Sequence, residues 1–290
     1  MIKCSTMQFP INKLPIPEIL LEIPQPPKKL SIRGEFPDLQ KYTLLTVVGP
    51  RNYTSYGEDV CRTLIAGLKG YPVVIVSGLA HGIDKIAHES ALDNGLLTIA
   101  FPGSGLNDRS LYPRAQFQLA MRILESGGAL ISEFKDDQMP QVWVFPTRNR
   151  LMAGIARATL VIEAEHKSGT RITARLATEY NRDVLAVPGN IFSKSSEGTN
   201  ELIKLGAIPI TSSQDILEAL GFTITKTVPM DLFLQATPDE LRVLEKLSGP
   251  KKRGDLIREL GIPVHKANIL FSQMELNGLI KEIGGEIRRV

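Results

Sequence analysis

Six short apolar runs, each followed by a helical pattern, constrain the fold of this 290-residue chain more than any other feature. The runs are rich in β-branched residues and apolar on both faces, as strands buried inside a parallel sheet are. They span residues 44–48, 73–77, 97–101, 129–133, 159–163 and 184–187. Helical patterns follow them, at about 56–69, 82–93, 114–125, 149–156 and 171–181. This alternation predicts an α/β fold with a doubly wound parallel sheet over residues 36–222.

The segments on either side of this region have a different composition. Residues 1–35 hold six prolines, which favours an extended, proline-rich arm over a folded domain. Residues 223–236 lack a clear periodicity and are interpreted as a linker. Residues 237–290 then begin with a helix-capping sequence, Thr237-Pro238-Asp239-Glu240.

Three helices are expected in this last segment, at about 238–247, 253–260 and 264–277. Two short strands flank Gly284-Gly285, a dipeptide typical of a tight hairpin. Three helices followed by a β-ribbon form the pattern of a winged-helix domain, which often places its third helix in a DNA groove.

Composition limits the classes of function. The net charge is only +3, so a nucleic-acid surface would have to be a local patch. Two cysteines, Cys4 and Cys61, are too few for a disulfide framework or a cysteine-rich metal site. The N-terminus lacks the pattern of a secretory signal, and no apolar run is long enough to span a membrane. We therefore expect a cytoplasmic protein with no membrane association.

The most informative loop is FPTRNRLMAG, residues 145–154. It carries Phe145, Arg148, Asn149 and Arg150 ahead of an expected helix start, where free N–H groups attract anions. Phosphate capture beside a ring that can stack a base is a common way to hold single-stranded nucleic acid. The alternative is that Phe145 belongs to the core and the arginines are solvated or paired with Glu163 and Glu165.

Other loops at the same sheet edge have similar chemistry, because ligands of doubly wound sheets bind beyond the carboxyl ends of the strands. Each loop is weak evidence alone, but together they describe a groove for a string of phosphates. Its candidate residues, besides those of residues 145–154, are Gly49, Arg51, Lys167, Ser168, Gly169, Arg171, Lys194, Thr199 and Asn200.

Catalytic and metal signals are weak by comparison. His81, Asp84 and His88 have helical spacing, but capping or packing is the favoured interpretation over a metal site. No nucleophile–base set and no nucleotide-binding P-loop is present. The sequence therefore predicts a binding protein without a cofactor and not an enzyme.

The segments VVGPRNYTSYG, IVSGLAHGIDKIAH, FPTRNRLMAGIA, VIEAEHKSGTRITARLA and EGTNELIKLGA occur in this order. Their order and content resemble the DNA-processing protein family DprA, also called Smf, over residues 36–220. The last 54 residues also resemble that family's C-terminal winged helix.

The resemblance implies an extended Rossmann-like domain that dimerises, binds single-stranded DNA during natural transformation and loads the recombinase RecA. It implies that Phe145 stacks a base and that the GxR turn falls on Gly49, Pro50 and Arg51. The arginines of the family's RNR element fall on Arg148 and Arg150. Lys167 and the GTN residues Thr199 and Asn200 would lie near the DNA.

The chain departs from the family pattern in three places. Pro50 replaces a small hydroxyl residue and cannot donate an N–H. His81 replaces an arginine of the SGxARGID element, which removes a fixed charge. The proline-rich arm stands where many members have an N-terminal helical domain.

Two other functions remain open at this point. A phosphoribohydrolase-type nucleotide hydrolase has a related core, but the spacing of its PGGxGTxxE element is not met here. A transcription regulator would use the winged helix to read duplex DNA, yet the expected third helix offers only His265 and Lys266 as cations.

Overall fold

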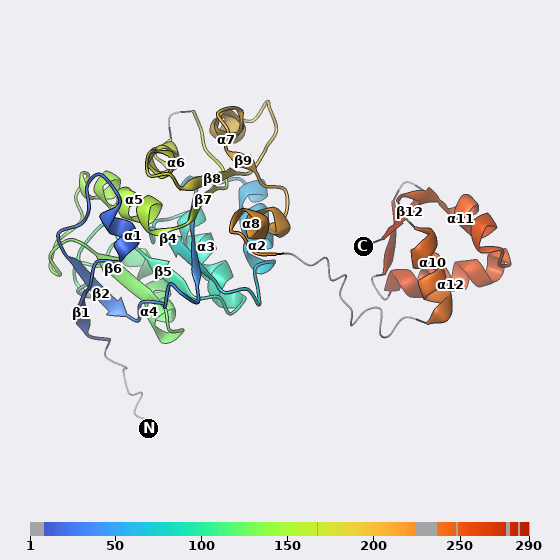
Figure 1. Ribbon diagram of the computed structural model, residues 1–290, viewed down its shortest axis with the longest axis horizontal. Coiled ribbons are helices and arrows are strands. Elements are labelled where there is room, and N and C mark those ends of the chain that lie inside the picture. The colour runs from blue at the N-terminus through green and yellow to red at the C-terminus, as the bar shows by residue number, and fades with distance from the viewer. Residues whose placement is uncertain are drawn as a thin grey trace, which may run out of the picture. The chain divides into compact units, whose positions relative to one another are not determined.

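The computed structural model describes residues 9–166, 168–223, 237–247, 249–276, 279–283 and 285–289, in two compact units divided after Thr223 (Figure 1). The first unit contains a nine-stranded sheet in the order β1-β2-β6-β5-β4-β3-β7-β8-β9. Strands β3 to β9 run parallel, as the apolar runs predict. Their bounds are β3 Thr43–Val48, β4 Val73–Ser77, β5 Thr98–Ala100, β6 Ala129–Ser132, β7 Ala158–Val161, β8 Asp183–Ala186 and β9 Ile208–Pro209.

The order of the strands reverses beside β3. Strands β4, β5 and β6 are added on one side of it, and β7, β8 and β9 on the other. The loops that follow β3 and β7 therefore diverge at the carboxyl edge, and this is the point where doubly wound sheets bind ligands.

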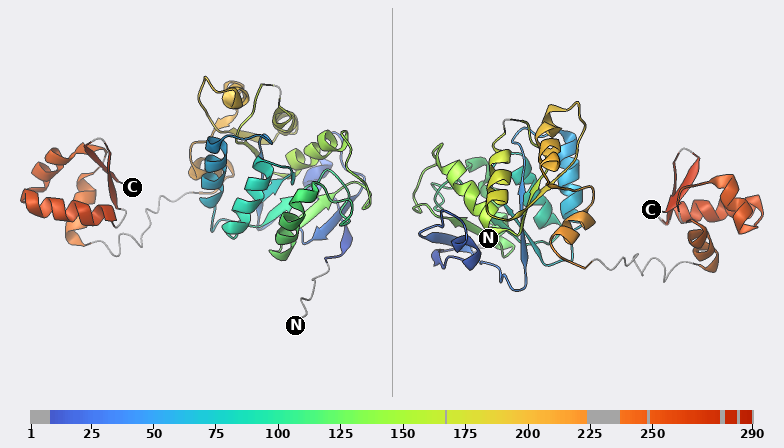
Figure 2. Two further views of the ribbon diagram at one scale, coloured as in Figure 1. Left: turned by 180° about the vertical axis from the view of Figure 1, so that it is seen from behind. Right: turned by 45° about the horizontal axis from the view of Figure 1, so that its top comes forward.

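Helices cover both faces of the sheet, which confirms the α/β fold (Figures 1 and 2). On one face α2, α3 and α4 pack side by side, and on the other α5 packs against α1 and α6. Leu45, Ile75 and Ile99 in the central strands are almost fully buried. The helices are α2 Ser55–Ala66, α3 Ile83–Asp93, α4 Phe117–Glu125 after a 3-10 turn at Arg114–Gln116, α5 Val144–Ile155, α6 Thr170–Glu179, α7 Lys194–Lys204 and α8 Ser213–Ala219.

The described part of the N-terminal segment, residues 9–35, differs from the expected extended arm. Strands β1 (Ile11–Leu14) and β2 (Leu30–Gly34) join the sheet antiparallel beside β6, with helix α1 (Glu18–Leu21) between them. The prolines of residues 9–35 fall outside both strands and the helix, where no ladder N–H is needed. Leu20 and Ile23 are buried against α5, so this segment is part of the folded domain.

Helix α5 begins earlier than the periodicity predicts. We expected it at residue 149, but it starts at Val144 and includes Phe145, Pro146 and Arg148. Pro146 is tolerated because it lies in the first turn, where backbone N–H groups have no helical partner. The ring and the two arginines are consequently held on a helix and not on an irregular loop.

The second unit has the helices that the sequence predicts, α10 Pro238–Lys246, α11 Arg253–Leu260 and α12 Val264–Leu276. Thr237 accepts a hydrogen bond from the Glu240 N–H, and the Glu240 side chain accepts one from the Thr237 N–H, a capping box. Strands β10 (Lys251–Lys252), β12 (Glu286–Arg289) and β11 (Ile280–Ile283) form a small antiparallel sheet. Its assignment as a winged helix stays a prediction, and most of the expected linker lies outside the described residues.

Among the helices of the described ranges, none is long and apolar enough to cross a membrane.

Candidate nucleic-acid interface

A cleft of about 440 Å³ lies at the carboxyl edge, where the strand order reverses. Residues that follow β3, β4 and β7 line it, together with the first turns of α5. The cleft brings together seven of the residues that the sequence predicts for a binding site: Gly49, Arg51, Phe145, Arg148, Asn149, Ser168 and Gly169.

The mouth of the cleft combines an aromatic ring with a free cation. The Arg51 guanidinium carbon lies 5.6 Å from the centroid of the Phe145 ring. Arg51 is exposed and forms no ion pair with any residue that the structure describes. Phe145 is half-buried, so the ring is not simply core, and Tyr112 packs against it with centroids 6.1 Å apart. A flat base and a phosphate can both be bound by this arrangement.

The floor of the cleft contains a buried pair of opposite charges. Arg148 is only 5% exposed and donates a hydrogen bond of 2.6 Å from Nη1 to the Phe101 carbonyl. Its Nε has no partner among the described residues. Burial lowers the pKa of the Arg148 guanidinium, and the nearby Asp84 carboxylate opposes that effect. Burial raises the pKa of Asp84, which accepts a hydrogen bond from the Gly78 N–H at 3.1 Å.

Position 78 requires glycine because the side chains of Arg148 and Asp84 lie too close to its backbone to leave room for a Cβ. A Cβ there would lie 1.6 Å from Arg148 Nη1 and 2.6 Å from an Asp84 carboxylate oxygen. The loop after β4 therefore packs directly against the charged groups of Arg148 and Asp84. Through its contacts with Gly78 and with the Phe101 carbonyl, Arg148 connects the segments that follow β4 and β5.

Arg150 does not face the cleft. It forms an ion pair of 2.5 Å with Glu133, and both side chains are largely buried. The alternative pairing with Glu163 or Glu165 does not occur for either arginine. Glu163 instead accepts hydrogen bonds from the Thr54 N–H (3.0 Å) and hydroxyl (2.6 Å), and so fixes the start of α2.

The loop after β7 contributes the beginning of helix α6. Ser168 Oγ is buried without a partner in the described residues, and the position of Gly169 is open to solvent. Lys167 lies outside the described residues. Arg171 donates to the His166 carbonyl at 2.6 Å and pairs with Glu201 at 2.9 Å, so its charge is engaged by α7.

The residues after β8 build a rigid loop instead of lining the cleft. Asn200 holds Gly189 through two hydrogen bonds, accepting from its N–H at 3.2 Å and donating to its carbonyl at 3.1 Å. Thr199 is buried, and its hydroxyl donates to the Ser196 carbonyl. Lys194, the third residue predicted in this segment, is exposed at the start of α7.

The possible metal set does not form a site. His88 is fully buried, its Nδ1 lies 2.7 Å from the Thr98 hydroxyl, and burial lowers its pKa to about 3. Within the described ranges no cluster of three His, Cys, Asp or Glu residues is arranged to hold a metal ion. His88 is therefore a packed core residue, and Asp84 accepts hydrogen bonds from backbone N–H groups of the loop after β4.

Sequence reasoning missed three residues at the cleft and its mouth. Asn52 and His81 line the cleft, and Tyr112 contacts the Phe145 ring. Asn52 and His81 lie in the loops directly after β3 and β4, which is the signal that identified their neighbours. Tyr112 lies in the longer segment between β5 and α4.

Comparison with known proteins identifies the family of this chain. The family described as DNA recombination-mediator protein A matches residues 9–221, well over half of the chain. The chain belongs to this family. It is 38% identical to protein Smf of Escherichia coli K12 over 283 residues, covering 94% of this chain and 74% of that protein. It is 40% identical to the DNA processing protein DprA of Streptococcus pneumoniae over 203 residues, or 70% of each chain.

Solved structures of family members share the fold. The structure of DprA from Streptococcus pneumoniae superposes with a TM-score of 0.67 at 38% identity, covering 75% of this chain and 76% of that one. DprA from Helicobacter pylori superposes with a TM-score of 0.66 at 32% identity, covering 73% and 96%. The latter structure concerns the single-stranded DNA binding mode of that protein. The family resemblance expected from the sequence is thus confirmed.

Proposed function

We propose that this protein binds single-stranded DNA along the carboxyl edge of its sheet, with the cleft beside β3 and β7 as the central contact. The observation that carries the proposal is the unpaired Arg51 over the Phe145 ring at the mouth of that cleft. A phosphate can pair with the guanidinium while a base stacks against the aromatic pair of Phe145 and Tyr112. The binding of single-stranded DNA by the relative from Helicobacter pylori supports the same function.

Family membership supports a wider role, which is part of this proposal. As a DNA recombination mediator, the protein would act in the cytoplasm, protect single strands during natural transformation, and load RecA onto them as a homodimer. No step of this role requires catalysis by the protein or a bound cofactor.

The predicted basic residues differ in whether their charges are free to contact phosphates. Arg51 and Lys194 present free charges, whereas Arg148, Arg150 and Arg171 are engaged by groups of the protein itself. Phosphate neutralisation therefore falls mainly on Arg51 and Lys194 and on the predicted residue Lys167. Gly49, Asn149, Ser168 and Gly169 provide the lining and the start of a helix.

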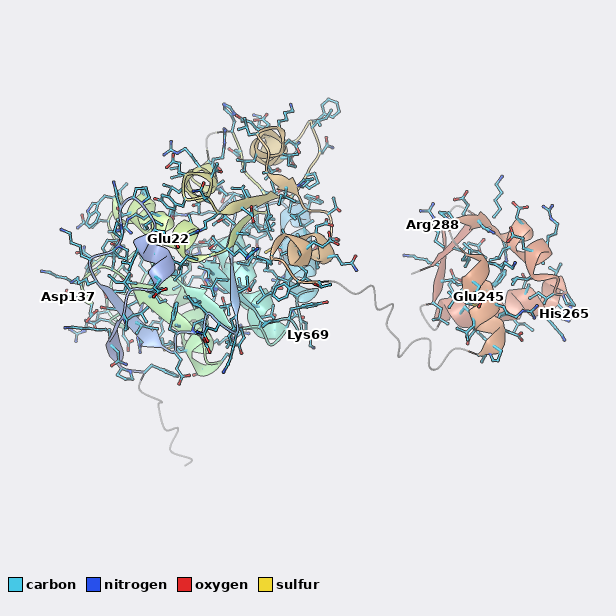
Figure 3. All side chains as sticks on the ribbon, viewed as in Figure 1. Glu22, Lys69, Asp137, Glu245, His265 and Arg288 are labelled. Atoms are coloured by element: carbon cyan, nitrogen blue, oxygen red, sulfur yellow. The ribbon has the colours of Figure 1, made fainter. Side chains whose placement is uncertain are left out.

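The test is the salt dependence of oligothymidylate binding, measured by fluorescence anisotropy. Replacing Arg51 with Ala removes one phosphate contact, so affinity should fall and the slope of log K against log salt should decrease by roughly 0.7. Lys69→Ala is the matched control, because Lys69 lies in the turn between α2 and β4 at the opposite edge of the sheet (Figure 3). An equal effect of the two substitutions would contradict a site at the carboxyl edge.

The nucleotide hydrolase is tested with the same protein. Release of a free base from a nucleoside monophosphate, lost in the Arg51→Ala variant, would replace the binding proposal with an enzymatic one.

A further inference from the structure

The loop between β8 and α7 exposes two large apolar side chains that contribute nothing to the core. Phe192 is 90% exposed and Ile191 is 78% exposed. Isolated exposed apolar residues are common, but two adjacent ones at the tip of a loop are a candidate contact surface.

This loop is fixed in place by hydrogen bonds from several elements. Asn200 clamps Gly189 from α7, and the Tyr56 hydroxyl donates to the Pro188 carbonyl at 2.9 Å from α2. Within the loop, the Phe192 N–H donates to the Asn190 side-chain oxygen at 2.9 Å. Gly198 of α7 donates its N–H to the Ala164 carbonyl at 2.7 Å, which ties this helix to the segment after β7.

Holding the backbone of the loop in this way costs conformational entropy and buries no apolar area of Phe192 in the domain. A backbone that is already fixed does, however, lower the entropic cost of binding a ligand at the ring. The arrangement is therefore more useful for binding than for folding.

The loop lies on the same edge of the sheet as the cleft. It follows the carboxyl end of β8, and β7 alone separates β8 from β3. With strands spaced by about 4.8 Å, the ends of β3 and β8 are roughly 10 Å apart. Arg51 follows β3, so the loop after β8 begins near the mouth of the cleft on the same edge of the sheet.

A cation without an ion pair among the described residues follows the ring closely in sequence. Lys194 is exposed, comes two residues after Phe192, and forms no ion pair in the part of the chain that the structure describes. It is the first residue of α7, whose N-cap Ser193 makes no side-chain capping bond. A base on Phe192 and its phosphate beside Lys194 would together bind one nucleotide unit.

We infer that Phe192 is a second base-stacking platform, and that with Lys194 it extends the single-strand site from the cleft across β7 to β8. This inference rests on the proposed function. It also gives a role to the GTN residues: Asn200 and Thr199 act as positioning residues that hold the loop, and Phe192 makes the contact.

The test compares oligothymidylates of about four and about twenty nucleotides, since only the longer one reaches both platforms. Phe192→Ala should weaken binding of the longer strand at least about fivefold and leave the shorter strand unaffected, and Phe192→Trp should retain binding. Leu39→Ala is the matched control, because Leu39 is exposed and precedes β3 at the opposite edge. A strand containing 5-iodouracil should crosslink to Phe192.

The outcomes separate the two proposals. Failure of the unmodified protein to bind either strand would remove the proposed function and this inference with it. Normal binding of the longer strand by the Phe192→Ala variant would overturn the inference alone. The inference would also be overturned if the variant lost self-association in sedimentation and no crosslink to Phe192 formed, since the ring would then belong to a protein interface.

Discussion

Replacing Arg148 with Met should destabilise the first unit strongly, because it leaves Asp84 as a buried carboxylate without a counter-charge. Arg148 is 5% exposed and Asp84 is 7% exposed, so solvent screens their interaction little. Leaving one of two neighbouring buried opposite charges uncompensated typically costs about 3–5 kcal/mol of unfolding free energy. The Phe101 carbonyl also loses the donor that lies 2.6 Å from it.

The chain provides its own probe for this experiment. Trp143 is the single tryptophan, lies directly before α5 and packs edge-on against Phe134 with centroids 5.6 Å apart. Its fluorescence in a urea titration therefore reports on the first unit alone. The double variant with Asp84→Asn has no unpaired charge and should recover much of the loss, with a coupling energy of about 1–3 kcal/mol.

The loss should depend on pH with a defined sign. Burial raises the pKa of Asp84, and removing Arg148, which lowers that pKa, raises it further. A carboxyl with a raised pKa in the folded state binds its proton more tightly there, so folding is favoured as the pH falls. The destabilisation relative to the unmodified protein should therefore be smaller at about pH 5 than at about pH 8. An unchanged urea midpoint, or a loss independent of pH, would refute the assignment of a buried charge pair.

Two further predictions concern stability. Gly82→Ala should lower the urea midpoint markedly, because Gly82 has φ 81° and a Cβ there would lie 2.3 Å from the Pro50 carbonyl oxygen; Gly169→Ala, with nothing within 4 Å, is the control and should be nearly neutral. His88 is buried as the neutral imidazole with its pKa lowered to about 3, so the unfolded chain binds a proton that the folded one does not, and stability should fall as the pH drops below about 6.5. His88→Gln should reduce that acid sensitivity in pH-dependent unfolding curves, and an identical profile would show that another group is responsible.

The sheet was predictable because its strands are apolar on both faces. The runs at 44–48, 73–77 and 129–133 match observed strands to within a residue, since burial on both faces leaves little freedom in sequence. The helices between them also lie close to their expected ranges, apart from α5. There the proline at 146 disguised the first turn of the helix.

The N-terminal segment was harder to predict because its prolines dominate its composition. Strand β1 is a four-residue edge strand that pairs with β2, which in turn pairs with β6 from residues 129–132, and its Ile11 and Leu14 pack against the core. Local sequence does not contain this long-range partner.

Seven of the predicted residues line one cleft, but the environments of its arginines could not be read from the sequence. Strand order determines which loops meet, and this led to Arg51, Phe145 and Ser168. Burial of Arg148 depends on Asp84, 64 positions earlier in the chain, and pairing of Arg150 depends on Glu133. The sequence shows which residues are charged, but only the folded structure shows which of these charges are not paired with groups of the protein.

The most direct test of the account is anisotropy of a labelled oligothymidylate against a matched duplex, with the full chain and its Arg51→Ala variant. We expect salt-sensitive binding of the single strand, much weaker binding of the duplex, and impaired single-strand binding by the variant while its urea midpoint is unchanged. Preference for the duplex, or binding that is indifferent to Arg51, would contradict a single-strand site at the carboxyl edge of the sheet.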